Sequence, residues 1–273
     1  MEESAPSPRH PIDTVAEHYS ADAAAYETSW APVLRPHGRR LLERLPLGVA
    51  RRVLDAGAGV GTLLADLQRM APSATVVAAD VSPGMIARAD RSLPRLVMDM
   101  TRLGFPGETF DVVVIAFALF HLEEPERALR EAHRVLRHGG ALGTATWDGE
   151  PRFAAQTIWM EELDAHGAAV EGPGFANHEP VSSPGKMRDQ LEAAGFGSIE
   201  SWMAPFDHPY DPEEFITIRT TRGYARRRLE SLDTGRRHAF LRRVRERLSS
   251  LPASDFVDRC QMVYATGLRP ASC

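Results

Sequence analysis

The sequence is poor in cysteine and has no long apolar run. Its two cysteines, Cys260 and Cys273, are too few for a disulfide framework and make no metal-binding cluster. No stretch approaches the ~20 apolar residues that a membrane-spanning helix needs, and the first residues lack the basic-then-apolar order of a signal peptide. These absences argue against a membrane partner and predict a cytoplasmic protein.

An excess of positive charge is also absent. The net charge of −5 at pH 7 argues against general nucleic-acid binding, because phosphate neutralisation needs a basic surface. Lys186 is the only lysine, and this arginine-rich, lysine-poor composition is typical of a GC-rich genome, which favours a role in natural-product biosynthesis. The arginine-rich segment 219–247 is interpreted as a solvated helix face, with binding of an anionic substrate as the alternative.

What the sequence does contain is an apolar strand, a glycine-rich turn and a helix in direct succession. Val53, Leu54 and Asp55 end the strand, and the turn Gly57–Gly61 has glycine at every second position. Glycine tolerates positive φ and has no Cβ, so the backbone can turn sharply and lie close to a ligand. Leucines at helical spacing follow, as in a helix that packs on a sheet. The segment indicates a nucleoside-cofactor loop.

The spacing of these glycines separates two classes of cofactor. Dinucleotide-binding turns have the spacing G-x-G-x-x-G and hold a pyrophosphate at the helix N-terminus. Here the third glycine of that pattern is replaced by Thr62, counted from Gly57, or by Leu64, counted from Gly59. Asp55 beside the loop would repel a pyrophosphate and attract an ammonium group. The pattern therefore favours a cofactor that carries an amino acid.

Further strand and helix signals follow along the chain. The apolar run Thr75–Ala79 ends in a second acid, Asp80, and the run Leu96–Met98 ends in a third, Asp99. The continuous apolar run Phe110–Phe117 suits a central parallel strand buried on both faces. The other elements predicted here are a helix over 125–136, ended by Gly139 and Gly140, and a strand over 141–147.

This order of motifs resembles the class I S-adenosylmethionine-dependent methyltransferases, in the small-molecule branch that includes quinone C-methyltransferases and natural-product tailoring enzymes. The resemblance covers roughly residues 50–147. It implies an α/β fold, with a Rossmann-like, seven-stranded, mostly parallel sheet, helices on both faces and a helical lid. It also implies S-adenosyl-L-methionine as the cofactor. The expected cofactor-binding residues are Tyr19, Asp55, Gly57, Ala58, Gly59, Asp80, Val81, Met85, Asp99, Met100, Ala116 and Phe117.

The resemblance also assigns individual roles. Asp80 is expected to accept hydrogen bonds from both ribose hydroxyls, Val81 and Met85 to pack on the adenine ring, and Asp99 to meet the adenine amino group. His121 follows the fourth strand, at the edge where open α/β sheets bind ligands, and is the candidate catalytic base. A structural hydrogen bond is the alternative role of His121. No cluster of His, Asp and Glu demands a metal.

Two tyrosines near the N-terminus form a further candidate pair. Tyr19 and Tyr26 lie on one face of a predicted helix and resemble the tyrosine pair of this branch, in which the helix covers the cofactor. At least one of them is expected to close the active site against water, and Tyr26 is a catalytic candidate; packing in the core is the alternative for both. His178 and His208 are weaker candidates for a base.

The chain is expected to divide into five parts. These are a disordered N-terminus (1–11), a helical cap (12–48), the cofactor-binding core (49–149), a lid insertion (150–185) and a C-terminal part of the core (186–273). The cap is expected to contain helices over 12–30 and 36–45, and the lid a helix over 153–163. The C-terminal part is expected to contain a helix over 187–195, strands over 198–206 and 259–269, and a helical insertion at about 207–255. The acceptor pocket is expected among residues 12–30, 117–122, 150–182 and 206–225.

The expected reaction is transfer of a methyl group to an O, N or C atom of a small molecule, in secondary-metabolite biosynthesis, by a monomer or homodimer. Such an enzyme mainly holds the reacting atoms in line. Two alternatives stay open. One is an enzyme of this fold that uses the bound cofactor as a scaffold for a non-methylating step such as cyclisation or decarboxylation. The other is a cofactor-sensing or partner-binding protein without turnover.

Overall fold

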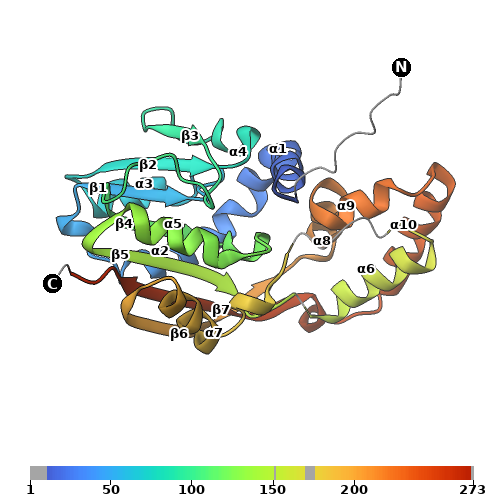
Figure 1. The fold of residues 1–273 in the computed structure, drawn as a ribbon. Coiled ribbons are helices and arrows are strands. Elements are labelled where there is room, and N and C mark those ends of the chain that lie inside the picture. Colours follow the sequence, from blue (N-terminus) through green and yellow to red (C-terminus); the bar gives the residue numbers. More distant parts are fainter. Residues whose placement is uncertain (1–10, 151, 170–175, 272–273) are drawn as a thin grey trace, which may run out of the picture.

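A computed structural model describes residues 11–150, 152–169 and 176–271, with a seven-stranded sheet at its centre (Figure 1). The strands are β1 (Arg52–Ala56), β2 (Thr75–Asp80), β3 (Arg95–Val97), β4 (Phe110–Ala116), β5 (Leu136–Trp147), β6 (Gly197–Pro209) and β7 (Val257–Leu268). Their order is β3-β2-β1-β4-β5-β7-β6. Neighbours from β3 to β5 are parallel, whereas β7 is antiparallel to β5 and to β6. This topology confirms the predicted Rossmann-like fold.

Helices lie before the first strand and between the later strands of the sheet. The α-helices are α1 (Pro11–Ser29), α2 (Ala31–Leu42), α3 (Leu64–Met70), α4 (Pro83–Ile86), α5 (Pro125–Val135), α6 (Ala154–Ala165), α7 (Pro184–Ala193), α8 (Pro212–Thr221), α9 (Gly223–Glu230) and α10 (Thr234–Leu248). Short 3-10 helices are η1 (Leu47–Val49), η2 (Leu119–His121), η3 (Glu179–Val181) and η4 (Ala253–Phe256). Residues 1–10 of the segment expected to be disordered (1–11) lie outside the described residues, and Pro11 is the first residue of α1.

The predicted boundary of the second helix is wrong. The sequence predicts a helix over 36–45, but α2 begins at Ala31 and contains Pro36 in its interior. Pro36 lacks a backbone N–H and so removes one helical hydrogen bond. Burial of Ala31 and Leu34, one turn before it, is the packing gain that carries the helix past the proline.

Strand boundaries also differ from the expectation. The helix predicted over 125–136 is confirmed to within one residue, but the strand predicted over 141–147 begins at Leu136, because the chain from there onward joins the sheet beside β4. In the C-terminal half, β6 extends to Pro209, beyond the predicted end of that strand. Backbone pairing between long strands therefore overrides the local turn signal of the paired glycines.

The sheet is covered on both faces because side chains alternate along its strands. Val112 and Val114 of β4 pack with α2 and α3 on one face, and Val113 and Ile115 pack with α5 and α7 on the other. This two-sided burial explains why the strand is apolar at consecutive positions. The arrangement leaves the carboxyl ends of β1, β2 and β4 together at one edge, where ligands bind in open α/β sheets (Figure 1).

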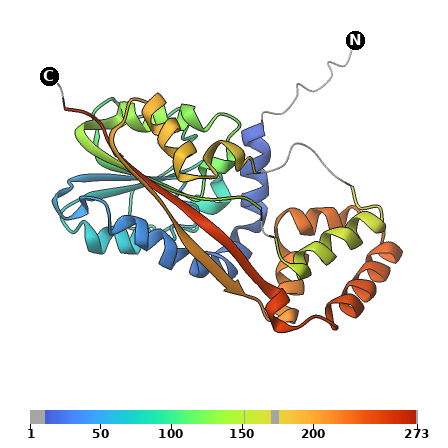
Figure 2. The same cartoon turned by 90° about the horizontal axis from the view of Figure 1, so that it is seen from below.

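Four helices, α6, α8, α9 and α10, form a second body beside the sheet, which we term the helical unit. Its own core includes Trp159, Phe215 and Phe240, which are fully buried. The strands β6 and β7 run from the sheet to this unit as a long antiparallel ribbon (Figure 2). The helix of the expected lid and the later helical insertion thus pack together as one unit.

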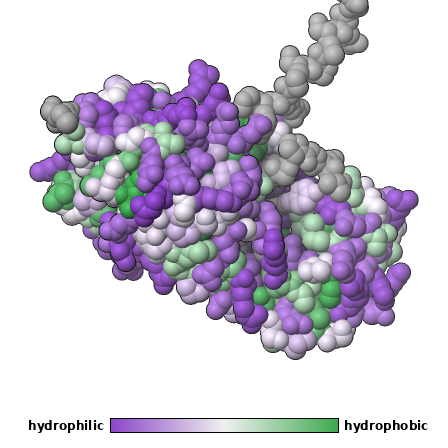
Figure 3. Space-filling view, turned by 60° about the horizontal axis from the view of Figure 1, so that its bottom comes forward, coloured by the Kyte–Doolittle hydropathy of each residue, from purple (hydrophilic) through white to green (hydrophobic). Residues whose placement is uncertain are grey.

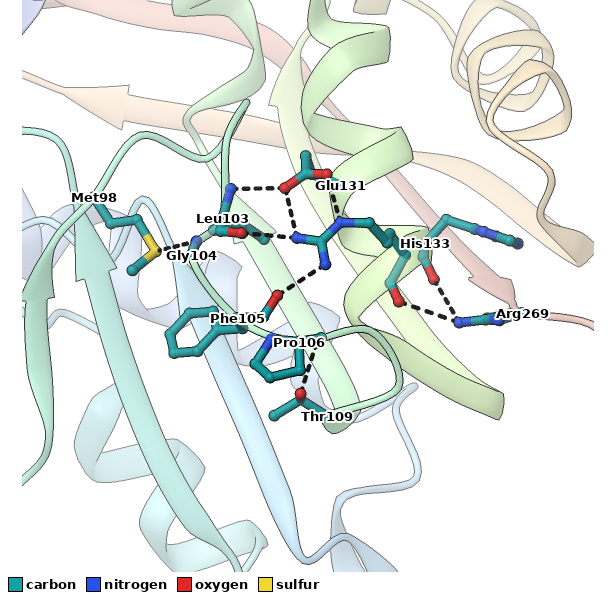
Figure 4. Close-up of polar contacts among 10 residues, drawn as sticks. Met98, Leu103, Gly104, Phe105, Pro106, Thr109, Glu131, His133 and Arg269 are labelled. Atoms are coloured by element: carbon teal, nitrogen blue, oxygen red, sulfur yellow. Dashed lines mark hydrogen bonds and ion pairs between the residues drawn. The ribbon is translucent and has the colours of Figure 1, made fainter.

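The loop between β3 and β4 is fixed to α5 by one arginine. Arg134 donates hydrogen bonds to the carbonyl oxygens of Leu103 (2.7 Å) and Phe105 (2.8 Å), and it pairs with Glu131 (Figure 4). Glu131 in turn accepts a hydrogen bond from the backbone N–H of Leu103 at 2.7 Å. The loop follows Met100, so this network fixes one wall of the ligand edge.

The surface of the molecule is mixed in character. Figure 3 shows scattered hydrophobic patches among hydrophilic side chains on one face of both the sheet domain and the helical unit. Two exposed apolar side chains, Leu96 and Val97, belong to the edge strand β3. Single exposed apolar residues of this kind are normal on a protein surface.

The separate core of the helical unit leads to a first prediction. Phe240→Ala should lower the free energy of unfolding by about 3–5 kcal/mol, because it leaves a cavity against Trp159, whose ring centroid is 4.9 Å away. Urea unfolding measures the change, and His238→Ala on the exposed side of the same helix is the control. Equal stability of the two variants would contradict the assignment of Phe240 to the core.

Candidate active site

A cavity lies at the edge of the sheet where β1, β2 and β4 end. It encloses about 820 Å³, including its mouth, and α1 forms one of its walls. The structure brings together every expected site residue except Asp99 around this cavity: Tyr19, Tyr26, Asp55, Gly57, Ala58, Gly59, Asp80, Val81, Met85, Met100, Ala116, Phe117 and His121. Its lining is mainly apolar, with two carboxylates among the polar groups.

The first carboxylate, Asp80, is held by backbone amides. The N–H of Gly59 donates to Oδ2 and the N–H of Ser82 donates to Oδ1, both at 2.8 Å. These bonds stabilise the charged form, although burial raises the pKa of Asp80 above its ordinary value. Each carboxylate oxygen retains a free lone pair, so Asp80 can still accept hydrogen bonds from a ligand in the cavity.

The glycine loop can reach Asp80 only because of its backbone conformation. Gly59 has φ +56° and Gly57 has φ +81°, in the left-handed region that other residues rarely adopt. A Cβ on Gly57 would also lie 2.8 Å from the Cβ of Ala118, which is closer than two carbon atoms can approach. The loop therefore presents bare backbone to the cavity.

The second carboxylate, Asp55, is nearly free of polar partners. It lies at the end of β1, is 2% exposed, and lines the cavity. Within the described ranges it makes no side-chain hydrogen bond. Burial and the nearby Asp80 carboxylate raise the pKa of Asp55 to about 7. A cation bound beside Asp55 would reverse this shift, so the site fits a positively charged group.

Apolar side chains form the wall next to Asp80. Met85 of α4 is buried, and Val81 joins it in the lining. Ser82 caps α4 by accepting a hydrogen bond from the N–H of Met85 at 3.2 Å. The hydroxyl of Ser82 is 2.8 Å from that of Ser20 on α1. Thus α1 is tied directly to the wall that would face a planar base.

A hydrogen bond joins α1 to the segment after β4. The Tyr19 hydroxyl lies 2.7 Å from Nε2 of His121. The Tyr26 ring contacts Tyr19 edge-on at 6.0 Å between centroids. Burial raises the pKa of both tyrosines well above the ordinary range, so both are neutral phenols. Nε2 of His121 is thus engaged by Tyr19, which is the structural role that the sequence left open as an alternative.

Asp99 is the expected site residue that lies outside the cavity lining. Its carboxylate accepts hydrogen bonds from the N–H and the hydroxyl of Thr101, each at 2.8 Å. It borders two shallow surface grooves beside the cavity, together with Ile12. Its expected contact with an adenine amino group stays a prediction.

Sequence reasoning did not name every lining residue individually. Ile12, Val15, Ala118 and Leu122 lie in the ranges expected for the acceptor pocket, whereas Leu34, Thr62, Leu63 and Ser82 were not expected to line a site. Ile12 and Val15 lie seven and four positions before Tyr19 and share its helix face, so helical spacing could have identified them. Leu34 could not be found in this way, because the predicted helix begins after it.

Aromatic rings connect the cavity with the helical unit. Phe117 lines the cavity with φ +58°, a rare value for an aromatic residue, and contacts Trp147 at 5.6 Å between ring centroids. Trp147 contacts Phe206, which contacts Trp30, at 5.0 and 6.2 Å. This row, Phe117–Trp147–Phe206–Trp30, gives the site a second, aromatic side.

The two weaker base candidates lie apart from the carboxylates. His178 stacks on Phe120 at 4.7 Å and pairs with Glu150 at 3.3 Å. His208 lies 5.8 Å from the Trp30 ring, and burial lowers its pKa below the ordinary value. Neither histidine lines the cavity.

The described residues offer neither a metal-binding cluster nor a membrane-spanning helix. In the described part of the chain, no group of three or more His, Cys, Asp or Glu side chains could hold a metal ion. None of the helices there combines the length and apolarity that crossing a bilayer requires. The cytoplasmic location and the monomeric or homodimeric state stay predictions.

The bond between Tyr19 and His121 leads to a second prediction. Tyr19→Phe and His121→Ala should each destabilise the fold, and a double-mutant cycle should give a coupling free energy of about 1 kcal/mol. Chemical unfolding of the four proteins measures it. The control cycle pairs Tyr19→Phe with His138→Ala, a surface histidine bonded to the carbonyl oxygen of Pro270, and should be additive. Additivity in both cycles would contradict the hydrogen bond.

Comparison with known proteins identifies the family. The family described as "Methyltransferase domain" matches residues 54–143. The demethylmenaquinone methyltransferase of Thermus thermophilus is 33% identical over 172 residues, covering 57% of this chain and 76% of that protein. The malonyl-[acyl-carrier protein] O-methyltransferase of Herminiimonas arsenicoxydans is 33% identical over 183 residues, covering 67% of this chain and 66% of that enzyme. The match spans 51% to 66% of the length of several curated relatives.

A solved structure shows the same fold over nearly the whole chain. The [4+2]-cyclase SpnF superposes with a TM-score of 0.56 at 18% identity, covering 98% of this chain and 100% of that chain. The matched residues 54–143 include both carboxylates and the glycine loop that meet in the cavity. The chain belongs to the S-adenosylmethionine-dependent methyltransferase family.

Proposed function

We propose that the protein is an enzyme that transfers a methyl group from S-adenosylmethionine to an O, N or C atom of a small molecule. One observation carries the proposal. Asp55 and Asp80, at the tips of neighbouring strands, face a single cavity with the glycine loop between them. Among the described residues Asp55 has no side-chain hydrogen-bond partner, and an ammonium group would supply one. Asp80 retains free acceptor positions, which two ribose hydroxyls would occupy.

The cavity offers a place for each part of this cofactor. Asp55 would hold the ammonium group and Asp80 the ribose hydroxyls, while Val81 and Met85 supply an apolar face for adenine. When bound, S-adenosylmethionine supplies an electrophilic methyl group on a positively charged sulfur. The further residues proposed to bind it are Tyr19, Gly57, Ala58, Gly59, Asp99, Met100, Ala116 and Phe117.

The remaining residues would position the acceptor and exclude water. The α1 helix, anchored by Tyr19 to His121 and by Ser20 to Ser82, closes one side of the cavity. Tyr26 is a neutral phenol that would form a wall for the acceptor. For an acceptor hydroxyl or acidic carbon, His121 would act as the base through Tyr19, whose hydroxyl would take the acceptor proton as it passes its own proton to Nε2.

The substrate class is proposed from composition and cavity. The mainly apolar lining suits a small organic acceptor, and the arginine-rich composition supports a role in natural-product biosynthesis. A cyclase with this fold covers nearly the whole chain, so a non-methylating step is the alternative. Incubation with deuterated-methyl S-adenosylmethionine and a small-molecule extract separates the two, because methyl transfer produces labelled products and a scaffold role produces only unlabelled ones. A lack of any new product would contradict both reactions.

Loss of Asp80 leads to a third prediction. Asp80→Ala should weaken binding of S-adenosylhomocysteine more than tenfold, because two charge-assisted hydrogen bonds are lost. Asp80→Asn keeps the shape and one acceptor oxygen and should have a smaller effect. Isothermal titration calorimetry measures both, with Asp189→Ala on the exposed side of α7 as the control. An unchanged dissociation constant in Asp80→Ala would count against the proposed site.

The raised pKa of Asp55 leads to a fourth prediction. In the free protein Asp55 titrates with a pKa of about 7, and only its ionised form attracts an ammonium group. Affinity for S-adenosylhomocysteine should therefore fall by about tenfold from pH 8 to pH 6, with proton release on binding below pH 7. Titration in buffers of different ionisation enthalpy measures the released protons. Asp55→Asn should bind weakly at both pH values, and a wild-type affinity that rises on acidification would contradict the assignment.

A further inference from the structure

The junction between α8 and α9 is an abrupt break that directs one arginine toward the active site. Arg222 is extended, with φ −154° and ψ 165°, and Gly223 after it has φ +75°. The N–H of Gly223 donates a hydrogen bond to Oδ2 of Asp22 on α1 at 2.7 Å. This bond fixes the break against α1, so the position of Arg222 is set by the backbone of both elements.

The guanidinium of Arg222 is placed against aromatic rings, not against a carboxylate. Its central carbon lies 4.8 Å from the centroid of the Trp30 ring. Its Nε is buried and has no hydrogen-bond partner. Burial lowers the pKa of Arg222, whereas Tyr26 and Tyr19 lie close enough to raise it. Arg222 is thus close enough to the two tyrosines that line the cavity for their charges to influence one another.

The surrounding charges do not neutralise this guanidinium. The nearby carboxylate of Asp22 is already used by the N–H of Gly223 and by Arg226, at 2.9 Å. His18, next to Asp22, is neutral because burial and the charge of Arg227 lower its pKa to about 4. Arg226 pairs with Glu230 as well, and the charge of Asp22 also acts on Arg222, but no carboxylate in the described part of the chain forms an ion pair with Arg222. A partly buried cation without an ion-pair partner is costly, and an anionic ligand would offset that cost.

A second orphan polar atom lies on the same patch. Nε2 of His208 is buried without a hydrogen-bond partner, and its ring contacts Trp30 at 5.8 Å. Arg222 is among the charges that lower the pKa of His208. From Trp30 the aromatic row leads to Phe117 in the cavity. Unsatisfied polar atoms beside a row of rings suit a planar ligand with a polar end.

We propose that Arg222 determines substrate specificity: the methyl acceptor is a planar, conjugated carboxylic acid that lies beside Tyr26 in the cavity and directs its carboxylate to the Arg222 guanidinium. This proposal rests on the proposed methyltransferase function and adds the substrate class. A guanidinium matches a carboxylate with two parallel hydrogen bonds, which an uncharged amide of the same shape cannot reproduce. Arg222 acts here in binding and takes no part in the transfer itself.

The test compares two probes that differ only in charge. The affinities of 2-naphthoate and 2-naphthamide are measured by calorimetry or ligand-observed NMR, with the protein saturated with S-adenosylhomocysteine. Wild-type protein should bind 2-naphthoate about tenfold tighter or more, because a charge-assisted pair is worth about 1.5–3 kcal/mol. Arg222→Gln should bring the two affinities within about twofold of each other, and Arg222→Lys should keep part of the preference.

A control variant and the wild-type protein itself show whether the preference for the carboxylate depends on Arg222. Arg236→Gln removes an exposed arginine of α10 and should leave the preference unchanged. Equal binding of the two probes by wild-type protein, or binding of neither, overturns the proposal without recourse to any variant. A carboxylate preference that survives in Arg222→Gln also overturns it. The affinity for S-adenosylhomocysteine is measured on the same samples and should be unchanged in Arg222→Gln. If the wild-type protein did not bind S-adenosylhomocysteine, that result would instead contradict the proposed function.

Discussion

Repulsion between two carboxylates, Asp55 and Asp80, is the constraint on which the rest of the site depends. Both end neighbouring parallel strands and face one cavity, so the charge of each disfavours the charge of the other. Two backbone amides stabilise the charged form of Asp80, whereas burial and the Asp80 charge raise the pKa of Asp55. The free protein thus contains a buried carboxyl group, Asp55, whose pKa lies near neutral pH, and such shifted pKa values are common at functional sites. A cation is the partner that this arrangement lacks.

The α1 helix links this electrostatic arrangement to the rest of the molecule. Three of its residues contact three different parts: Tyr19 bonds to His121 after β4, Ser20 to Ser82 at the cap of α4, and Asp22 to the junction of α8 and α9. The same helix therefore covers the cavity and connects the sheet domain to the helical unit.

The cofactor half of the site could be predicted from the sequence because its signals are local and mutually consistent. The run to Asp55, the glycine turn and the apolar strand Phe110–Ala116 each obey short-range rules, and the structure places them together. For Asp99 the structure shows a local bond to Thr101, two residues away, and a place beside the cavity lining, so its expected contact with a ligand stays a prediction. The start of α2 depends on packing against the sheet, so a proline signal alone misplaced it.

The acceptor half was much less predictable. Interpretation of segment 219–247 as a solvated helix face is wrong for Arg219 and Arg228, which are 8% and 4% exposed. Arg228 pairs with Asp164 of α6, and Arg219 donates to Gln156 of the same helix. Composition could not separate these arginines from exposed ones, since the distinction arises from a helix break and from contacts between segments far apart in the sequence.

The ribbon of β6 and β7 has a consequence for how such proteins diversify. The two strands pair without a register shift from Glu200 to Pro209, with Trp202 opposite Tyr264 and their rings stacked at 5.3 Å. The segment from α8 to α10 is inserted at the far end of this ladder. Insertions, deletions or recombination within that bracketed segment leave the strand register intact. Only α6, which enters from the end of β5, must be exchanged along with it. The helical unit can thus change in sequence and length without altering the strands that end at the cavity.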